Sequence, residues 1–163
     1  AKLHRRGVTI PDPLPPMGVM IEVPGAALAA DAFAQASDFF AIGSNDLTMY
    51  TLAIDRGNEH VAHLFDPLHP GVLRLIQFTA TAALRARIPV SICGEMAGDP
   101  RYSALLLGLG IRDLSMTPSS IPRVKQRIRE MDMDAANRRA GVIMDQVDSG
   151  RIATLLDDFN ALA

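Results

Sequence analysis

The sequence predicts an α/β fold with a parallel sheet, because short strand-like runs alternate with helical patterns along the chain. Four runs of apolar residues predict strands at 18–22, 39–42, 90–93 and 113–116. Strands that are joined by crossover helices lie parallel to one another. With 163 residues, 48% hydrophobic and 21% charged, the chain has the composition of about one globular domain.

The helical segments follow from apolar residues that recur at spacings of three and four. They predict helices over 25–36, 70–87 and 100–109, each of which has a proline at or near its first turn, where proline is favoured. Two further segments with one polar face predict helices over 134–148 and 151–162, outside the sheet.

The interval over 45–65, between the second and third strands, is longer than one crossover needs. We expect it to form extra short helices over the strand ends, where they would close on a ligand. The proline-rich segment 11–16 predicts a stiff, extended lead-in to the first strand.

Charge and composition exclude several classes of partner. The net charge of −2 gives no basic surface for nucleic acid. No apolar run reaches the roughly 18 residues that a membrane helix needs, and the first residues do not resemble a signal peptide. The single cysteine, Cys93, cannot form an internal disulfide. We therefore expect a cytoplasmic protein that binds neither nucleic acid nor membranes.

Reactive side chains follow three of the predicted strands. Glu22 follows the first strand, Asn45 and Asp46 follow the second, and Cys93 ends the third among glycines. Parallel sheets present functional groups at the carboxyl ends of their strands, and glycines there let a substrate approach closely. Glu22 and Asp46 offer the oxygen ligands that Mg²⁺ prefers. An Asn-Asp pair also opens helices as an N-cap, and that alternative stays open.

Five segments, taken together, resemble one known family. They read, in order, GVMIEVP, FFAIGSNDLTMYTLAIDRGN, LHPGVLRLI, CGEMAGDP and LLGLGIRDLSM. This set resembles the phosphoenolpyruvate (PEP)-binding domain of enzyme I, the PEP-protein phosphotransferase of bacterial phosphotransferase systems. The resemblance covers residues 18–129. Met49 departs from it, because glutamine is usual there, and that puts one supporting hydrogen bond in doubt.

The resemblance implies the C-terminal half of a (β/α)8 TIM barrel, with about four βα units over 1–131. A helical tail over 132–163 is then expected to pack on the barrel. The family's phosphoryl-accepting histidine and the arginines of its first barrel strands have no counterpart in these residues. We therefore expect the 163 residues alone to be unable to transfer phosphoryl groups.

The resemblance also implies the activity and the roles of single residues. The family moves a phosphoryl group from PEP to its own histidine and on to a histidine-containing phosphocarrier protein, releases pyruvate, and works as a homodimer. By resemblance, Glu22 and Asp46 are Mg²⁺ ligands, Asn45, Asp46 and Arg56 contact the substrate, and Cys93 is the proton donor.

The chemistry of the residues agrees with these roles but leaves alternatives. Arg56 has a planar fork that binds phosphate or carboxylate oxygens, although an arginine in a turn is often simply solvated. The Cys93 thiol, with an ordinary pKa of about 8.5, holds a proton at neutral pH and can donate it. A free cysteine on a strand is also commonly a small core residue.

Other candidates have plainer interpretations. We expect His60, His63 and His69 to be solvated or capping residues and not a metal cluster. The basic residues of 123–129 predict a solvated helix face. Two rival functions remain: a PEP synthase or pyruvate phosphate dikinase, which the residues after Cys93 disfavour, and a non-catalytic dimerisation module. The choice between a sugar and a nitrogen phosphotransferase system stays open.

Overall fold

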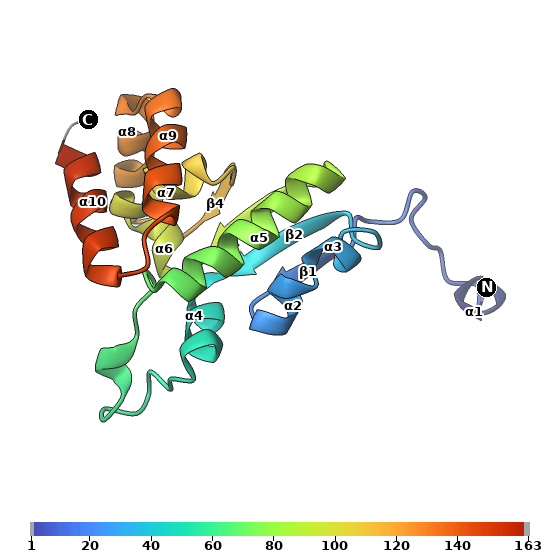
Figure 1. Cartoon of the computed structure of the whole chain (residues 1–163). Coiled ribbons are helices and arrows are strands. Elements are labelled where there is room, and N and C mark those ends of the chain that lie inside the picture. Colours follow the sequence, from blue (N-terminus) through green and yellow to red (C-terminus); the bar gives the residue numbers. More distant parts are fainter. Residues whose placement is uncertain (1, 162–163) are drawn as a thin grey trace.

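Four strands form one parallel sheet in the computed structural model, which describes residues 2–161 (Figure 1). The strands are β1 (Gly18–Ile21), β2 (Phe39–Gly43), β3 (Val90–Cys93) and β4 (Asp113–Ser115). They lie side by side in chain order, and the register aligns Ile21, Ile42 and Ile92 across the first three. This arrangement confirms the predicted α/β fold, and its four βα units correspond to half of a TIM barrel.

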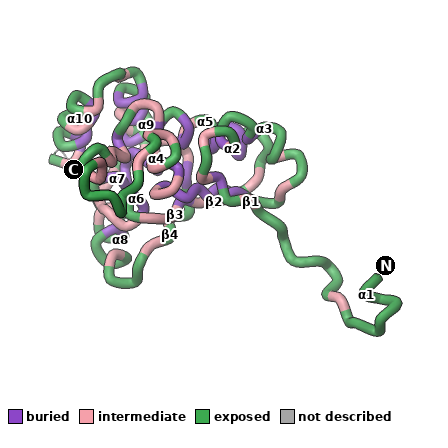
Figure 2. The backbone as a smooth tube through the Cα atoms, turned by 90° about the horizontal axis from the view of Figure 1, so that it is seen from below, coloured by how far each residue is buried: buried purple, intermediate pink, exposed green. Residues whose placement is uncertain are grey.

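Helices cover one face of the sheet, as Figure 2 shows. They include α2 (Pro24–Leu28), α3 (Ala30–Phe33) and α5 (Pro70–Ala86). Helix α5 lies against β2, β3, α2 and α3 and buries an apolar stripe that includes Leu73, Ile76 and Ala80. Under it, Ile42 and Ile92 are fully buried. This packing follows from the three-and-four spacing of the α5 sequence.

The opposite face of the sheet stays partly exposed. Successive side chains of a strand point to opposite faces, so Met20 and Phe39 face away from the helices that bury Ile21 and Phe40. Met20 is 46% exposed and Phe39 is 37% exposed. In a closed barrel this face forms the interior. The half-barrel therefore presents apolar surface that closure would bury.

Three helices follow the sheet and gather at one end of the molecule (Figure 1). They are α8 (Ile121–Glu130), α9 (Met133–Met144) and α10 (Ser149–Ala161). Helix α9 packs closely on α7 (Pro100–Gly108), with Ala136, Ala140 and Ile143 buried. The helices predicted over 134–148 and 151–162 are thus present with shifted ends, and the predicted end at Leu162 lies outside the described residues.

Several elements differ from the sequence-based expectation. The helix predicted over 25–36 is divided into α2 and α3, because Ala29 leaves helical geometry with φ −95° and ψ 13°. The interval over 45–65 holds α4 (Ser44–Leu52) and the short 3₁₀ helix η1 (Ala62–Leu64), as expected. Helices α1 (Lys2–Arg5) and α6 (Glu95–Gly98) are too short for periodicity to reveal them.

The N-terminal lead-in runs away from the sheet, with α1 at its far end (Figure 1). Most of its residues up to Met17 are exposed, in keeping with the predicted extended segment. Within residues 2–161, none of the helices combines the length and the apolar character that crossing a membrane requires.

The contact between α7 and α9 depends on the absence of a side chain at Gly108. A Cβ there would lie 2.6 Å from the backbone oxygen of Ala136 and 2.7 Å from the Cβ of Ala140. We expect Gly108→Ala to lower the free energy of unfolding by about 1–3 kcal/mol, because two packed helices would have to separate. Urea denaturation measures this. Gly141→Ala in α9 is the control, since a methyl group there would meet nothing within 4 Å, and it should be neutral or slightly stabilising.

Candidate active site

The carboxyl ends of the parallel strands lie together at one end of the sheet. The register places Gly43, Cys93 and Ser115 next to one another across β2, β3 and β4. Glu22 directly follows β1, and its carboxylate lies against Gly43: a Cβ at Gly43 would be 2.9 Å from Glu22 Oε2. The structure therefore brings together the ends of three strands that the sequence predicted to carry functional groups.

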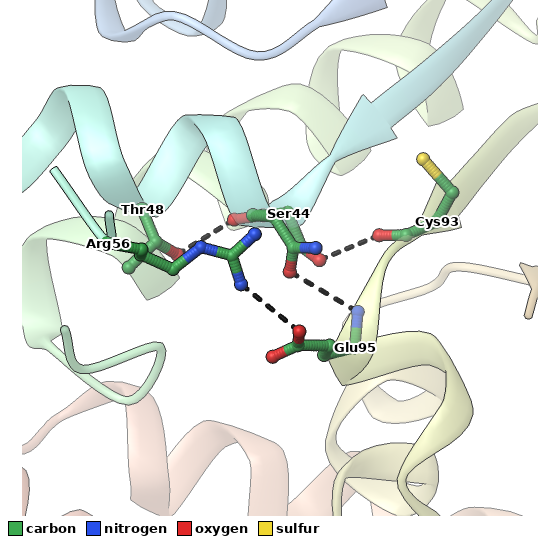
Figure 3. Close-up of polar contacts among 6 residues, drawn as sticks. Ser44, Thr48, Arg56, Cys93 and Glu95 are labelled. Atoms are coloured by element: carbon green, nitrogen blue, oxygen red, sulfur yellow. Dashed lines mark hydrogen bonds and ion pairs between the residues drawn. The ribbon is translucent and has the colours of Figure 1, made fainter. Parts of the chain in front are cut away.

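Ser44 links α4 to the end of β3 (Figure 3). Its hydroxyl donates a 2.6 Å hydrogen bond to the backbone oxygen of Cys93, and the Thr48 hydroxyl donates to the Ser44 carbonyl at 2.8 Å. Gly94 has φ 96°, and a Cβ there would lie 2.5 Å from Ser44 Oγ. Only glycine fits this position without strain. Ser44 was not among the residues predicted from the sequence, although a hydroxyl beside a strand exit is a usable signal.

Asn45 and Asp46 lie in the first turn of α4, and the N-cap of that helix is Gly43, without a side-chain capping bond. Neither side chain is the N-cap, so that part of the alternative is wrong, whereas its other part, a charge in the first turn of the helix, holds. Asp46 is favourably placed at the positive end of the helix dipole. Asn45 instead accepts a 3.3 Å hydrogen bond from the backbone N–H of Glu95. Both side chains stay partly accessible at the strand exits.

The Cys93 thiol is half-buried and lies near two carboxylates. Burial raises its pKa most, and the negative charges of Glu22 and Asp46 raise the pKa further, against a smaller lowering by a hydrogen bond of the backbone at Cys93. The thiol therefore keeps its proton at neutral pH. Glu22, Asp46 and Cys93 thus converge, and Cys93 borders a cleft, which a simple core residue would not do.

Arg56 reaches the same region from the loop after α4. Its Nη1 lies 3.1 Å from Glu95 Oε1 (Figure 3). Its guanidinium lies over the Phe65 ring, 4.9 Å from the centroid. Arg56 is therefore not a simply solvated turn residue. No contact with Glu95 was predicted from the sequence. An acidic residue in the first turn of a helix beside Cys93 was the available signal.

A cleft of about 710 Å³ opens at these strand ends. Asn45, Cys93 and Glu95 line one part of it, and residues from β4 to the start of α8, among them Arg123, line another. Its volume is within the usual range for small-molecule sites. Arg123 is exposed, as expected for a solvated helix face, and it also borders the cleft.

Arg127 departs from the predicted solvated face. It is half-buried, and its Nη2 donates a 3.0 Å hydrogen bond to Asn160 Oδ1 of α10.

The histidines considered as metal ligands have other roles. His69 caps α5, because its Nδ1 accepts a hydrogen bond from the Gly71 N–H at 3.1 Å, and His60 and His63 are exposed. Among residues 2–161, no three His, Cys, Asp or Glu side chains gather closely enough to hold a metal by themselves.

Glu22 and Asp46 are the side chains that suit a hard cation here. Magnesium is usually bound by one or two carboxylates, with substrate oxygens and waters as its other ligands. Two carboxylates that both act on the Cys93 thiol, which itself lines an open cleft, match that donor set. The residues present therefore fit a cation shared with a substrate, and they do not form a closed structural metal site.

Comparison with known proteins gives a consistent result. Residues 1–133 match the family described as PEP-utilising enzyme, PEP-binding domain. The chain is 52% identical over 146 residues to a PEP-protein phosphotransferase of Cupriavidus necator, covering 90% of this chain and 24% of that protein. A protein of the same name from Haemophilus influenzae is 43% identical over 143 residues, covering 88% and 25%.

A third relative has a different name. A multiphosphoryl transfer protein of Xanthomonas campestris is 51% identical over 125 residues, which cover 77% of this chain and 15% of that protein. The chain spans about a quarter of the length of the first two curated relatives that it matches.

The raised pKa of Cys93 makes a testable prediction. Glu22→Gln removes one of the negative charges that raise this pKa, so the pKa should fall relative to the unchanged chain. The thiolate then forms at lower pH, and the rate of alkylation by iodoacetamide against pH should shift to lower pH. Glu59→Gln, which removes a charge on an exposed loop, is the control. An unchanged profile for Glu22→Gln would show that Glu22 does not act on the thiol.

Proposed function

Because the chain belongs to the PEP-utilising enzyme family, we propose that its residues form part of a PEP-protein phosphotransferase. In this proposal PEP donates its phosphoryl group to a histidine of the same protein, which passes it to a histidine-containing phosphocarrier protein. Pyruvate is the product. The observation that carries the proposal is that Glu22 and Asp46 act on a protonated Cys93, which lines a cleft together with Asn45 and Glu95.

PEP carries a phosphate and a carboxylate, so its site must balance several negative charges. Glu22 and Asp46 would hold Mg²⁺, which neutralises charge on the substrate oxygens when it is bound. Asn45 offers amide N–H donors to an oxygen of the substrate, and Arg56 offers a fork of N–H groups. These residues position the phosphoryl group for transfer through a loose transition state, in which positioning and electrostatics do most of the work.

Cys93 would act after the phosphoryl group has left. Cleavage of the bond between phosphorus and the enol oxygen leaves the enolate of pyruvate, which must gain a proton at its terminal carbon. A thiol that stays protonated at neutral pH can give this proton, and the resulting thiolate recovers one from solvent. The same burial and neighbouring charges that raise the pKa favour return to the protonated form.

The exposed inner face of the half-barrel supports an assembled form. Met20 and Phe39 lie on it, and an apolar surface of this kind is commonly covered by another part of a protein. We propose a homodimer, a cytoplasmic location, and a requirement for the remaining barrel strands in catalysis. A pure dimerisation role would leave the Cys93 thiol and the two carboxylates that act on it unexplained. A dikinase or synthase is not among the names of the relatives described above.

A chimera tests the proposal directly. The matching segment of the Cupriavidus necator relative would be replaced by the residues described here. We expect Mg²⁺-dependent phosphorylation by PEP, and a loss of about 100-fold or more for Asp46→Asn or Glu22→Gln, because charge neutralisation is worth several kcal/mol. Incorporation of labelled phosphate measures it, with Asp145→Asn as a distant control. Near-normal turnover of either carboxylate variant would refute the ligand assignment.

In the same chimera, Cys93→Ala should slow pyruvate formation about 10²–10⁴-fold, the usual contribution of proton transfer by a side chain. The affinity for PEP should change little, because the thiol acts after the substrate is held. Ser91→Ala, on the same strand two residues earlier, is the matched control. Equal rates for Cys93→Ala and the control would reduce Cys93 to a packing residue.

A further inference from the structure

We propose that Glu95, which lines the cleft, is a positioning residue that holds the Arg56 guanidinium beside it and is exchanged for an incoming anion. Glu95 thereby weakens the binding of every anion that uses Arg56 by the same factor, including both substrate and product. The inference rests on the proposed function for the identity of those anions. Its physical basis, competition for one guanidinium, can be tested without any phosphoryl transfer.

Glu95 is held in place by its backbone, while its side chain is free to move. The backbone N–H donates to Asn45 Oδ1, and the residue begins the short helix α6. The carboxylate is 74% exposed, borders the cleft and makes its ion pair with Arg56 at 3.1 Å. Release of Arg56 therefore requires rotation of one exposed side chain and no movement of the backbone.

Arg56 is held from the other side by an aromatic ring. Its guanidinium lies 4.9 Å from the centroid of Phe65, and its side chain is 35% exposed. The ring restricts the plane of the guanidinium, and Glu95 engages its edge. A phosphate or carboxylate would bind to the same N–H groups of that edge. Glu95 contacts Nη1, so Glu95 and an anion that binds at Nη1 exclude each other there.

The strength of the pair sets the size of the effect. Exposed ion pairs are weak, so the paired form of Arg56 outweighs the free form by only a small factor. Competition within the protein divides the affinity of each ligand by the same number, whatever the charge of that ligand. From the usual strength of exposed pairs this number is about two to six. For an enzyme, such uniform weakening helps the product to leave.

Exchange at Arg56 and simple repulsion can be distinguished, because only exchange weakens the binding of all anions by the same factor. If Glu95 only repelled anions through space, its effect would grow with ligand charge, and a dianion would be affected much more than a monoanion. Inorganic phosphate near pH 8 serves as the dianion, and pyruvate serves as the monoanion. Both can be titrated into the full 163-residue chain while the NMR signal of the Arg56 Nε–H group is followed.

We expect Glu95→Gln to lower the Kd of phosphate and of pyruvate by the same factor, about two- to six-fold. The Arg56 signal should be displaced in the variant before any anion is added. In an Arg56→Ala background, followed through other cleft amides, Glu95→Gln should no longer matter. Glu59→Gln removes an equal charge from the same loop as Arg56 and should leave both Kd values unchanged.

Unchanged or weaker binding in Glu95→Gln would overturn the proposal, as would an effect that scales with ligand charge or persists without Arg56. Failure of both anions to bind to either chain at tens of millimolar would also overturn it. A chimera that does not turn over PEP, together with equal tightening in these titrations, would reject the proposed function and leave the exchange at Arg56 standing.

Discussion

Ser44 Oγ donates a 2.6 Å hydrogen bond to the Cys93 carbonyl where two neighbouring strands end, and the other groups of the site are arranged around this contact. Asn45 and Asp46 follow Ser44 in the same helical turn, so the contact determines where they lie relative to the thiol. Gly94 belongs to the same constraint, because a Cβ there would collide with the Ser44 hydroxyl. One hydrogen bond and one glycine therefore couple the ends of β2 and β3.

The sheet explains why this coupled end faces a cleft. Its helices cover the face that carries the buried Ile42 and Ile92, while Met20 and Phe39 on the other face are partly exposed. In a closed barrel that open face is filled by side chains from the other strands, and the cleft remains at the carboxyl ends. The carboxyl ends of the four strands are thus arranged as in a complete barrel, but the strands that would enclose the rest of the cleft are not among these residues. In the proposed function, the strands that would enclose the cleft would also complete the site.

Periodicity and turn chemistry predicted the strands and long helices well, because burial selects apolar residues at fixed spacings. They could not predict the break at Ala29, since Gly25 to Ala30 offers no residue that forces one. The convergence of Glu22, Asp46 and Cys93 followed from their places at strand ends. The Arg56–Glu95 pair did not, because it joins a loop to the short helix α6 across 39 residues, and an acidic residue in a first helical turn does not identify its partner. Arg127 was misjudged because its partner lies on a helix far along the chain.

A cation bound by Glu22 and Asp46 would change the charge around the Cys93 thiol, which has to stay protonated to act as a proton donor. Glu22 and Asp46 raise the Cys93 pKa only while they are negative. Bound Mg²⁺ would reduce that effect and would itself favour the thiolate. Burial, however, is the largest cause of the raised pKa, and it does not depend on these carboxylates. Closure of the remaining barrel over the cleft would deepen this burial. The proposed cation site is therefore compatible with a protonated thiol beside it, because the two depend on different physical effects.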